Sequence, residues 1–388
     1  MSEKLKHLSQ NEIENLIKEY YAGESIAALI SRYNIDVLPS QLVKAFPPKI
    51  LPQVCGYCGG QVVEAYSSKS SRYANPVFCI RCDHKLQGYC NCNGCRQIAH
   101  QAAIEQAEQE AAKKQIVAAR FAEILEANRP DAVDYDTLTF EQKVYLGAVL
   151  RAGISEDYSL LLPFEKMHSS VAPTDSFTNE IIHSLTKEAP ILLISPVSHF
   201  SSYGQKGDGN FYYHPDKVTW ELNLYKDGMN KVPLMDLIMN PSIMEASSDD
   251  KFRMWQKNAL EEVLQDLTYS VEALLKTDSP AGEKTKTVFS ALLRDYSTSQ
   301  IYGIIYNSIN QALRYKAETN IPNKRAANSV VGNAQSYGER ALANGWVINK
   351  RSRKRELPIS AISNFFFGKV LGIGDKGFTE KPTLEMCS

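Results

Sequence analysis

Hydrophobic positions recur with a helical period along most of the carboxyl-terminal half of the chain. Ile301, Ile304, Ile305, Ile309 and Leu313, for example, share one face of a helix, so we expect the tyrosines between them to pack in a core. The same spacing, with flanking helix breakers, predicts helices at 250–275, 287–293, 297–317, 323–343 and 358–370. The fold is therefore expected to be mainly α.

The segment 139–225 combines helical and strand patterns. Thr139 and Gln142 have the spacing of a capping box ahead of an apolar helix, and a second amphipathic helix is predicted at 177–187. Short apolar segments at 190–195 and 217–225 predict two strands, joined by a Gly-rich hairpin tip at 202–210. This order resembles a winged-helix domain, in which Lys206 at the tip would reach a phosphate; the alternative is an ordinary surface hairpin.

The first 50 residues predict three short helices. Asn11 and Glu14 have the spacing of an amino-terminal cap, Gly23 can close the first helix, and a second is predicted at 25–33. Pro39 suits the first turn of a third helix. The pattern resembles a helix-turn-helix, which implies that Ser40, Gln41 and Lys44 face DNA from the recognition helix. A three-helix packing module without nucleic acid is the alternative.

Residues 97–128 are rich in Ala, Glu, Gln and Lys and contain neither Gly nor Pro. These residue types favour one long helix, which Arg129-Pro130 ends. Its apolar spacing becomes regular only from Ile116 onwards, so the first half is expected to be a solvated spacer.

Seven of the eight cysteines lie between positions 55 and 95, and only Cys387 stands apart. Cys55 and Cys58 form one C-x-x-C pair, Cys79 and Cys82 form a second, and this pattern in a reducing compartment predicts metal ligands rather than disulfides. The intervening 20 residues suffice for a hairpin that brings the two pairs together. The module resembles a zinc ribbon, which implies at least one structural Zn²⁺.

Cys90, Cys92 and Cys95 add three thiolates, and His84 or His100 can supply a fourth ligand for a second Zn²⁺. The spacing leaves the pairing open. Cys55 and Cys58 can join Cys79 and Cys82, or they can join Cys92 and Cys95. An exposed histidine that binds no metal is the alternative for each of the two histidines.

A basic run follows the helix predicted at 323–343. It consists of Lys350, Arg351, Arg353, Lys354 and Arg355. We expect a positive surface that can contact phosphate, although such runs are also common as plain solvated surface. The whole chain has 43 Lys and Arg against 44 Asp and Glu, a formal net charge of -1, so nucleic-acid binding would have to come from local patches of this kind.

Composition and the absence of known motifs argue against membrane proteins, secreted proteins and several classes of enzyme. The 388 residues contain no apolar stretch long enough to span a membrane and no apolar secretory core at the polar start, so a cytoplasmic location is expected. P-loop, zinc-protease, hydrolase-elbow and kinase signatures are absent, and the G-x-G-x-x-G match at 372–377 lacks the βαβ unit that binds a dinucleotide. The sequence therefore indicates neither a catalytic residue nor a small-molecule substrate.

Five regions result. They are a helix-turn-helix-like head (1–50), a zinc-ribbon module (51–96), a linker helix (97–130), a winged-helix-like domain (131–225) and a helical carboxyl-terminal domain (226–388). This organisation favours a zinc-stabilised, non-enzymatic DNA-binding protein, such as a bacterial or mobile-element regulator. A zinc-stapled protein-interaction component of a defence or stress complex, or a homodimer, is the main alternative, and a nucleic-acid-processing enzyme is a third.

Overall fold

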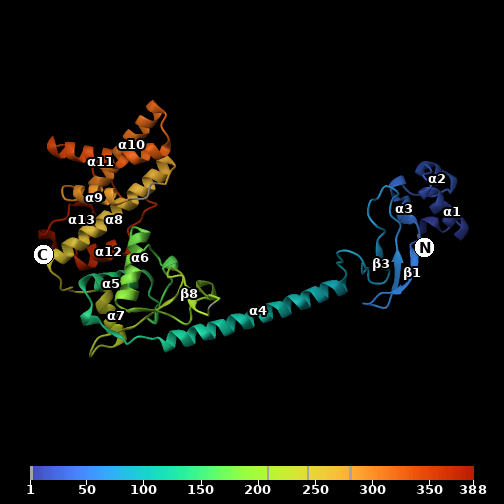
Figure 1. Cartoon of the computed structure of the whole chain (residues 1–388), viewed down its shortest axis with the longest axis horizontal. Helices are drawn as coiled ribbons and strands as arrows, with labels where there is room; N and C mark the ends of the chain where they lie inside the picture. The colour runs from blue at the N-terminus through green and yellow to red at the C-terminus, as the bar shows by residue number, and fades with distance from the viewer. Residues whose placement is uncertain (1–2, 208, 243, 279–281) are drawn as a thin grey trace. The chain divides into compact units, whose positions relative to one another are not determined.

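The structure is a computed structural model that describes residues 3–207, 209–242, 244–278 and 282–388. It is mainly helical with small sheets, which confirms the expected class, and it forms two compact units, Met1–Gln115 and Ile116–Ser388 (Figure 1). The long helix α4 (Asn93–Ala127) belongs to both units. No helix in the described part of the chain is long and apolar enough to cross a membrane.

The head contains α1 (Gln10–Tyr21), α2 (Ile26–Arg32) and a 3-10 turn, Pro39–Gln41, that continues into α3 (Leu42–Ala45). The cap of α1 is Ser9, whose side chain accepts from the Glu12 amide, and not the expected Asn11. The third helix is shorter than a recognition helix, with one α-helical turn. Leu16, Leu29 and Leu42, one from each helix, meet in a small hydrophobic core between the three helices.

An antiparallel sheet follows the head, in the order β1 (Lys49–Val54), β2 (Gln61–Glu64) and β3 (Val77–Cys79). The head packs on the chain after β2 through aromatic rings. Phe46 lies edge to face with Tyr20 and Tyr66, and the Tyr21 hydroxyl donates to the carbonyl of Ser67 at 2.5 Å. Head and sheet therefore form one compact unit.

Helix α4 confirms the predicted long helix. All side chains from Arg96 to Ile116 are exposed, as expected of a spacer, and the helix stays regular because its residues have high helix propensity. Near its end, Phe121 is buried, and its ring stacks on Tyr203 of the second unit with centroids 3.9 Å apart. Apolar packing thus begins where the sequence pattern becomes regular.

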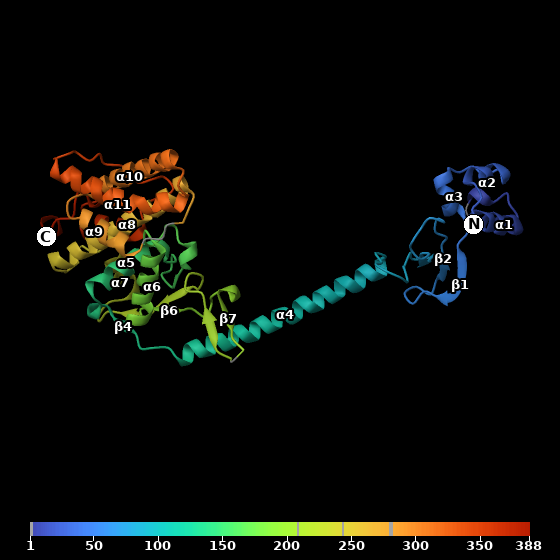
Figure 2. The same cartoon turned by 45° about the horizontal axis from the view of Figure 1, so that its top comes forward.

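The described residues of the second unit, called the body below, form three small sheets (Figure 2). Strand β9 (Trp220–Leu222) pairs antiparallel with β5 (Leu160–Leu161) and β6 (Leu192–Ile194). Strands β7 (Tyr203–Gln205) and β8 (Phe211–Tyr213) form a separate hairpin, and β10 (Leu224–Tyr225) pairs parallel with β4 (Val133–Asp134).

The expected single hairpin is therefore corrected. The two predicted strands do pair, but their connection contains the β7–β8 hairpin, and β5 adds a third strand that the sequence pattern does not predict. Lys206 is exposed at the tip of that hairpin, and Asp208 of the same tip lies outside the described residues. The winged-helix resemblance stays a prediction.

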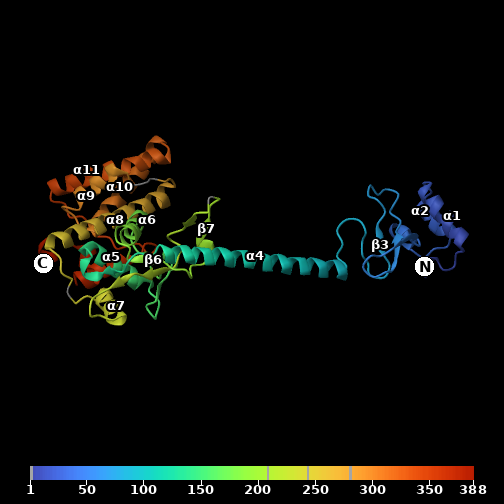
Figure 3. The ribbon, with the colours of Figure 1, turned by 60° about the horizontal axis from the view of Figure 1, so that its bottom comes forward.

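The helices of the body are α5 (Phe140–Gly153), α6 (Asp175–His183), α7 (Lys231–Met239), α8 (Ser248–Leu275), α9 (Glu283–Leu292), α10 (Thr298–Thr319), α11 (Asn323–Ala343), α12 (Ala361–Phe365) and α13 (Lys376–Thr379). One hydrophobic core extends from Tyr135 to Cys387 and includes Trp220 and Trp255. The expected boundary between residues 225 and 226 is therefore absent from the packing of the described residues. Helix α10 packs against both α8 and α11 (Figure 3).

A buried polar stripe runs along α8. Asn258, Glu262, Asp266 and Ser270 recur every four residues and are all at most 3% exposed. The segment after α11 pairs with the two carboxylates: Arg353 donates to both oxygens of Glu262 at 3.0 Å, and Lys354 pairs with Asp266. Asn258 instead donates to the hydroxyl of Ser363 on α12 at 2.9 Å. The stripe is thus neutralised from a segment without regular secondary structure.

Candidate metal centres

The first group of potential ligands consists of Cys55, Cys58, Cys79 and Cys82, whose sulfurs all lie within 4.8 Å of one another. The Sγ atom of Cys58 is 3.3 Å from that of Cys82 and 3.4 Å from that of Cys79. Four thiolates about 2.3 Å from a tetrahedral ion are about 3.8 Å apart. The group could therefore hold one metal ion after a small expansion.

Both C-x-x-C pairs have the same backbone geometry. The amide of Cys55 donates to the carbonyl of Gly60 at 2.8 Å, and the amide of Cys79 donates to that of His84 at 2.9 Å. In each turn the fifth residue, Gly59 or Asp83, has a left-handed backbone, with φ of 68° and 58°. One turn joins β1 to β2 and the other follows β3, so the sheet brings the two pairs of thiols face to face.

The second group contains His84, Cys90, Cys92 and Cys95. The Nδ1 atom of His84 is 3.6 Å from the Cys92 sulfur and 3.3 Å from the Cys95 sulfur. A tetrahedral ion with bonds of about 2.3 Å to sulfur and about 2.05 Å to nitrogen places these atoms about 3.5 Å apart. Nδ1 is therefore the ring atom in position to bind a metal.

The two groups share structural elements. His84 lies two residues after Cys82, at the end of the second turn, and Cys95 lies in the first turn of α4. The ring of Tyr57, from the first turn, packs on the His84 ring with centroids 4.2 Å apart. The first cysteine turn is thus in contact with a ligand of the second group.

Amide hydrogen bonds stabilise two of the thiolates. Amides of Cys92 and Lys85 lower the pKa of the Cys90 thiol to about 6. Burial raises the pKa of Cys79, but amides of Arg81 and Cys82 outweigh it and lower the value to about 7. Each group therefore contains one thiol whose ionised form, the form that binds metal, is favoured near neutral pH.

Little hydrophobic surface holds this part of the chain together. The core of the sheet consists of Cys55, Val62 and Cys79, whereas Ile50 and Val54 on β1 are exposed. A core of this size cannot offset the conformational entropy of about 45 ordered residues, so the cross-links through the metal would have to supply the difference.

Two of the predicted alternatives are settled by these positions. The two C-x-x-C pairs face each other, and the alternative that placed Cys55 and Cys58 with Cys92 and Cys95 is wrong. His84 belongs to the second group, whereas His100 is exposed on α4 and belongs to neither group among the described residues. His100 lies more than one helical turn beyond Cys95, and the helix carries it away from the thiols.

Comparison with known proteins reveals no relative: no family model, no curated protein and no solved structure matches the chain.

The predicted nucleic-acid residues differ in their surroundings. Ser40 and Gln41 lie in the 3-10 turn before α3 and Lys44 lies on α3, and all three side chains are exposed. In the basic run, Arg353 and Lys354 bind the buried carboxylates of α8, and Lys350 pairs with Glu380 at 3.0 Å. Only Arg351 and Arg355 are both exposed and without an ion pair in the described structure. Carboxylates thus pair with three of the five cations, and the expected contact of the basic run with phosphate stays a prediction.

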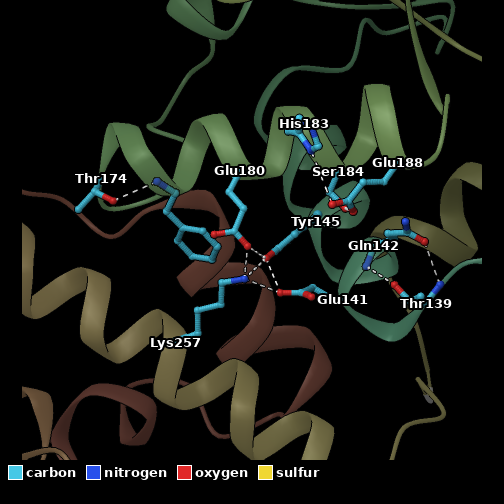
Figure 4. Close-up of polar contacts among 11 residues, drawn as sticks. Thr139, Glu141, Gln142, Tyr145, Thr174, Glu180, His183, Ser184, Glu188 and Lys257 are labelled. Carbon is cyan, nitrogen blue, oxygen red and sulfur yellow. Dashed lines mark hydrogen bonds and ion pairs between the residues drawn. The ribbon is translucent and has the colours of Figure 1, made fainter. Parts of the chain in front are cut away.

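A partly exposed charged cluster in the body has no counterpart among the predicted sites. The ammonium of Lys257 on α8 lies 2.6 Å from Glu141 and 2.7 Å from the Tyr145 hydroxyl, and it also pairs with Glu180 of α6 (Figure 4). Burial lowers the pKa of Lys257, but the two carboxylates outweigh it and raise the value. Lys257 is thus a fixed cation that links three helices, and these partners are too far apart in sequence to be recognised from it.

Proposed function

We propose that the amino-terminal unit is a zinc-ribbon-like module that holds two structural Zn²⁺ ions and binds DNA. Seven thiols and one imidazole form a donor set that suits zinc, and distances near those of a tetrahedron support this choice over the octahedral oxygen sites of Mg²⁺ or Ca²⁺. Four protein ligands at each ion leave no coordination position for water or substrate. Such ions stabilise a fold and do not catalyse.

The observation that carries the DNA proposal is unpaired positive charge on the zinc module. Residues 49–96 contain six Lys and Arg but only two Asp and Glu. None of these six cations forms an ion pair within the described part of the chain, whereas Lys4, Lys6 and Arg32 of the head all do. Exposed Arg72 and Lys85 are therefore available to bind phosphate.

Exposed aromatic rings accompany these cations. Tyr73 follows Arg72 in the loop between β2 and β3 and is 87% exposed, and Tyr89 is 83% exposed between Lys85 and Cys90. Tyrosine hydroxyls donate to phosphate, as they do in many protein–DNA interfaces. The support thus comes mainly from the zinc module, and Ser40, Gln41 and Lys44 of the head are proposed as additional contacts.

Fluorescence anisotropy of the zinc-loaded full chain with a labelled DNA duplex tests this proposal. The double variant Arg72→Ala/Lys85→Ala should weaken binding, and the slope of log affinity against log salt should become less steep by about 0.9 for each phosphate that the variant no longer binds. Lys6→Ala is the matched control, because it removes an exposed lysine that is paired with Glu3.

Zinc content must be measured on the same samples. Duplex affinity that is equal in the double variant and in Lys6→Ala, with two zinc ions bound to both, would contradict the proposed contacts. If the chain binds no duplex but captures a protein partner, and nuclease treatment does not abolish that capture, the protein-interaction function is favoured over DNA binding.

A further inference from the structure

The segment that forms α10, α11 and the chain after α11 is rich in Lys and Arg, and the surface that it forms is called the α10–α11 face below. From residue 298 to residue 351 there are seven Lys and Arg but two Asp and Glu. Lys350 is the only one of these seven that forms an ion pair among the residues that the structure describes. The net charge of -1 for the whole chain conceals this concentration.

A groove of about 430 Å³ lies on this face, within the range of about 300–1,000 Å³ that is typical of ligand sites. Three amide side chains of α10 line it, those of Asn307, Asn310 and Gln311. Arg314 of α10 and Arg340 of α11 line it as well, and its lining includes no acidic side chain in the described structure. The groove therefore offers hydrogen-bond donors and acceptors beside two positive charges.

The arginines are available to a ligand. Arg314 is exposed and forms neither an ion pair nor a hydrogen bond in the described part of the chain. Arg340 uses only Nε, which donates to the carbonyl of Ser336 at 3.0 Å, so its two terminal nitrogens stay open. Outside the groove lining, the Arg351 guanidinium lies over the Tyr306 ring, with its central carbon 3.4 Å from the ring centroid.

Two aromatic rings complete the groove. Helix α11 ends in a Schellman motif, in which the Trp346 amide donates to Ala341 and the Gly345 amide donates to Leu342, and Gly345 has a φ of 64°. This turn places Trp346 against the groove, where it is 49% exposed. The neighbouring Tyr337 is fixed by a hydrogen bond from Asn307 at 3.3 Å. An indole held by backbone geometry is thus presented to solvent beside unpaired arginines.

We propose that this groove binds single-stranded nucleic acid, with a base stacked on Trp346 and phosphates bound by Arg314 and Arg340. An aromatic face can stack only on a base that is not already stacked within a duplex, and amide side chains match the hydrogen-bonding edges of such a base. Because the groove carries positive charge, it should bind a polyanion more strongly than a protein surface of mixed charge. The inference rests on the proposed function for its class of ligand and on separate residues for its geometry.

Tryptophan fluorescence of the full zinc-loaded chain gives a direct test. The chain contains three tryptophans, and Trp220 and Trp255 are fully buried, so Trp346 alone is accessible to a base. Titration with oligodeoxythymidylate should quench the emission of Trp346, and oligouridylate tests RNA in the same way. The variant Trp346→Phe should keep a stacking ring but lose the quenching.

Point variants measure the contacts by anisotropy with the labelled single strand. Trp346→Ala should weaken binding by about tenfold, the effect of removing one stacked base. Arg314→Ala should weaken binding and reduce the salt slope by about 0.7. Arg253→Ala is the control of equal charge, because Arg253 lies in the first turns of α8 and pairs with Asp250. Thermal unfolding and zinc content confirm that each variant is folded.

The outcomes separate this site from the proposed DNA module. Quenching and affinity that depend on Trp346 and Arg314, but not on Arg72 and Lys85, support the groove. Single-strand binding that leaves the Trp346 emission unchanged would overturn the groove and leave the zinc module as the contact. Duplex binding through the zinc module without any single-strand binding would also overturn the groove alone. Absence of both kinds of binding overturns both proposals.

Discussion

At the scale of single residues, the packing of the first cysteine turn makes one glycine indispensable. A Cβ atom on Gly60 would lie 2.7 Å from the Cβ of Arg81 and 2.9 Å from the Cys79 sulfur. We expect Gly60→Ala to displace a ligand sulfur and to weaken metal binding at the four-cysteine group by about tenfold or more. Competition with a chromogenic zinc chelator measures this change.

The same turn contains a matched control. A Cβ atom on Gly56 would have no other atom within 4 Å, and the backbone of Gly56 is not left-handed, so Gly56→Ala should bind zinc as the natural chain does. Equal zinc affinity in the two variants would show that the sulfurs do not occupy the positions described above.

Lys257 gives a second prediction at this scale, which depends on pH. Burial raises the pKa of Glu141, but the hydrogen bond from Lys257 outweighs it and lowers the value, so the pair stabilises the fold above about pH 4.5. That stability is lost as pH falls through the lowered pKa. Lys257→Met should therefore destabilise the body by about 1–2 kcal/mol at pH 7, a value reduced because these side chains are partly hydrated.

Urea unfolding at about pH 7 and about pH 4 checks this dependence. The difference between natural chain and variant should shrink at the lower pH, because the unpaired carboxylates can take up protons there. A difference that is the same at both values would mean that Lys257 acts through packing of its aliphatic part and not through its charge.

At the scale of elements, α4 differs from the other long helices because its side chains from Arg96 to Ile116 are all exposed. Ala111→Pro should disrupt the helix locally, at a cost of about 3 kcal/mol to that segment, without loss of either core. Circular dichroism should show reduced helicity while zinc content and thermal unfolding of the body stay unchanged. Ala111→Lys, which keeps helix propensity, is the control, and a fall in the unfolding temperature of the body would show that the exposed segment is packed after all.

The long helices are the most predictable elements, because their apolar positions repeat over several turns. The predicted bounds of α11 match the structure, and the capping box of α5 at Thr139 and Gln142 is confirmed. The strands β4, β5 and β10 have two residues each, too few to show alternation, and the sequence does not reveal the sheets that they form. In the head, both Ser9 and Asn11 precede a glutamate by three residues, and only packing selects Ser9.

In the candidate sites too, features set by neighbouring residues are predictable, whereas features set by long-range packing are not. Cysteine spacing reveals all seven thiol ligands, because each turn is a local structure, but the partition between ions depends on how the sheet folds. The partners of the basic run cannot be seen in the sequence, since Glu262 and Arg353 lie 91 positions apart. The groove at Trp346 escapes prediction because the pattern of α10 assigns its tyrosines to the core: Tyr302 is buried there, but Tyr306 and Tyr315 are exposed.

At the scale of the whole molecule, the two units rely on different sources of stability. The body has one large apolar core, whereas the first unit has two small cores and eight potential metal ligands. We therefore expect two transitions in calorimetry, and a strong chelator should lower only the temperature of the transition of the first unit. The body transition in the same scan is the internal control. One transition that shifts as a whole would contradict the division into two units.

The pairing of Glu262 with Arg353 also constrains how these two positions can change during evolution. Loss of either partner leaves a charge inside the body without its counter-ion, which is far more costly than loss of both. Descendants of this chain can therefore change these two positions only together, although they are far apart in the gene. Among related chains, an uncharged residue at position 262 should accompany an uncharged residue at position 353, and a single replacement should survive only when a second one restores neutrality nearby.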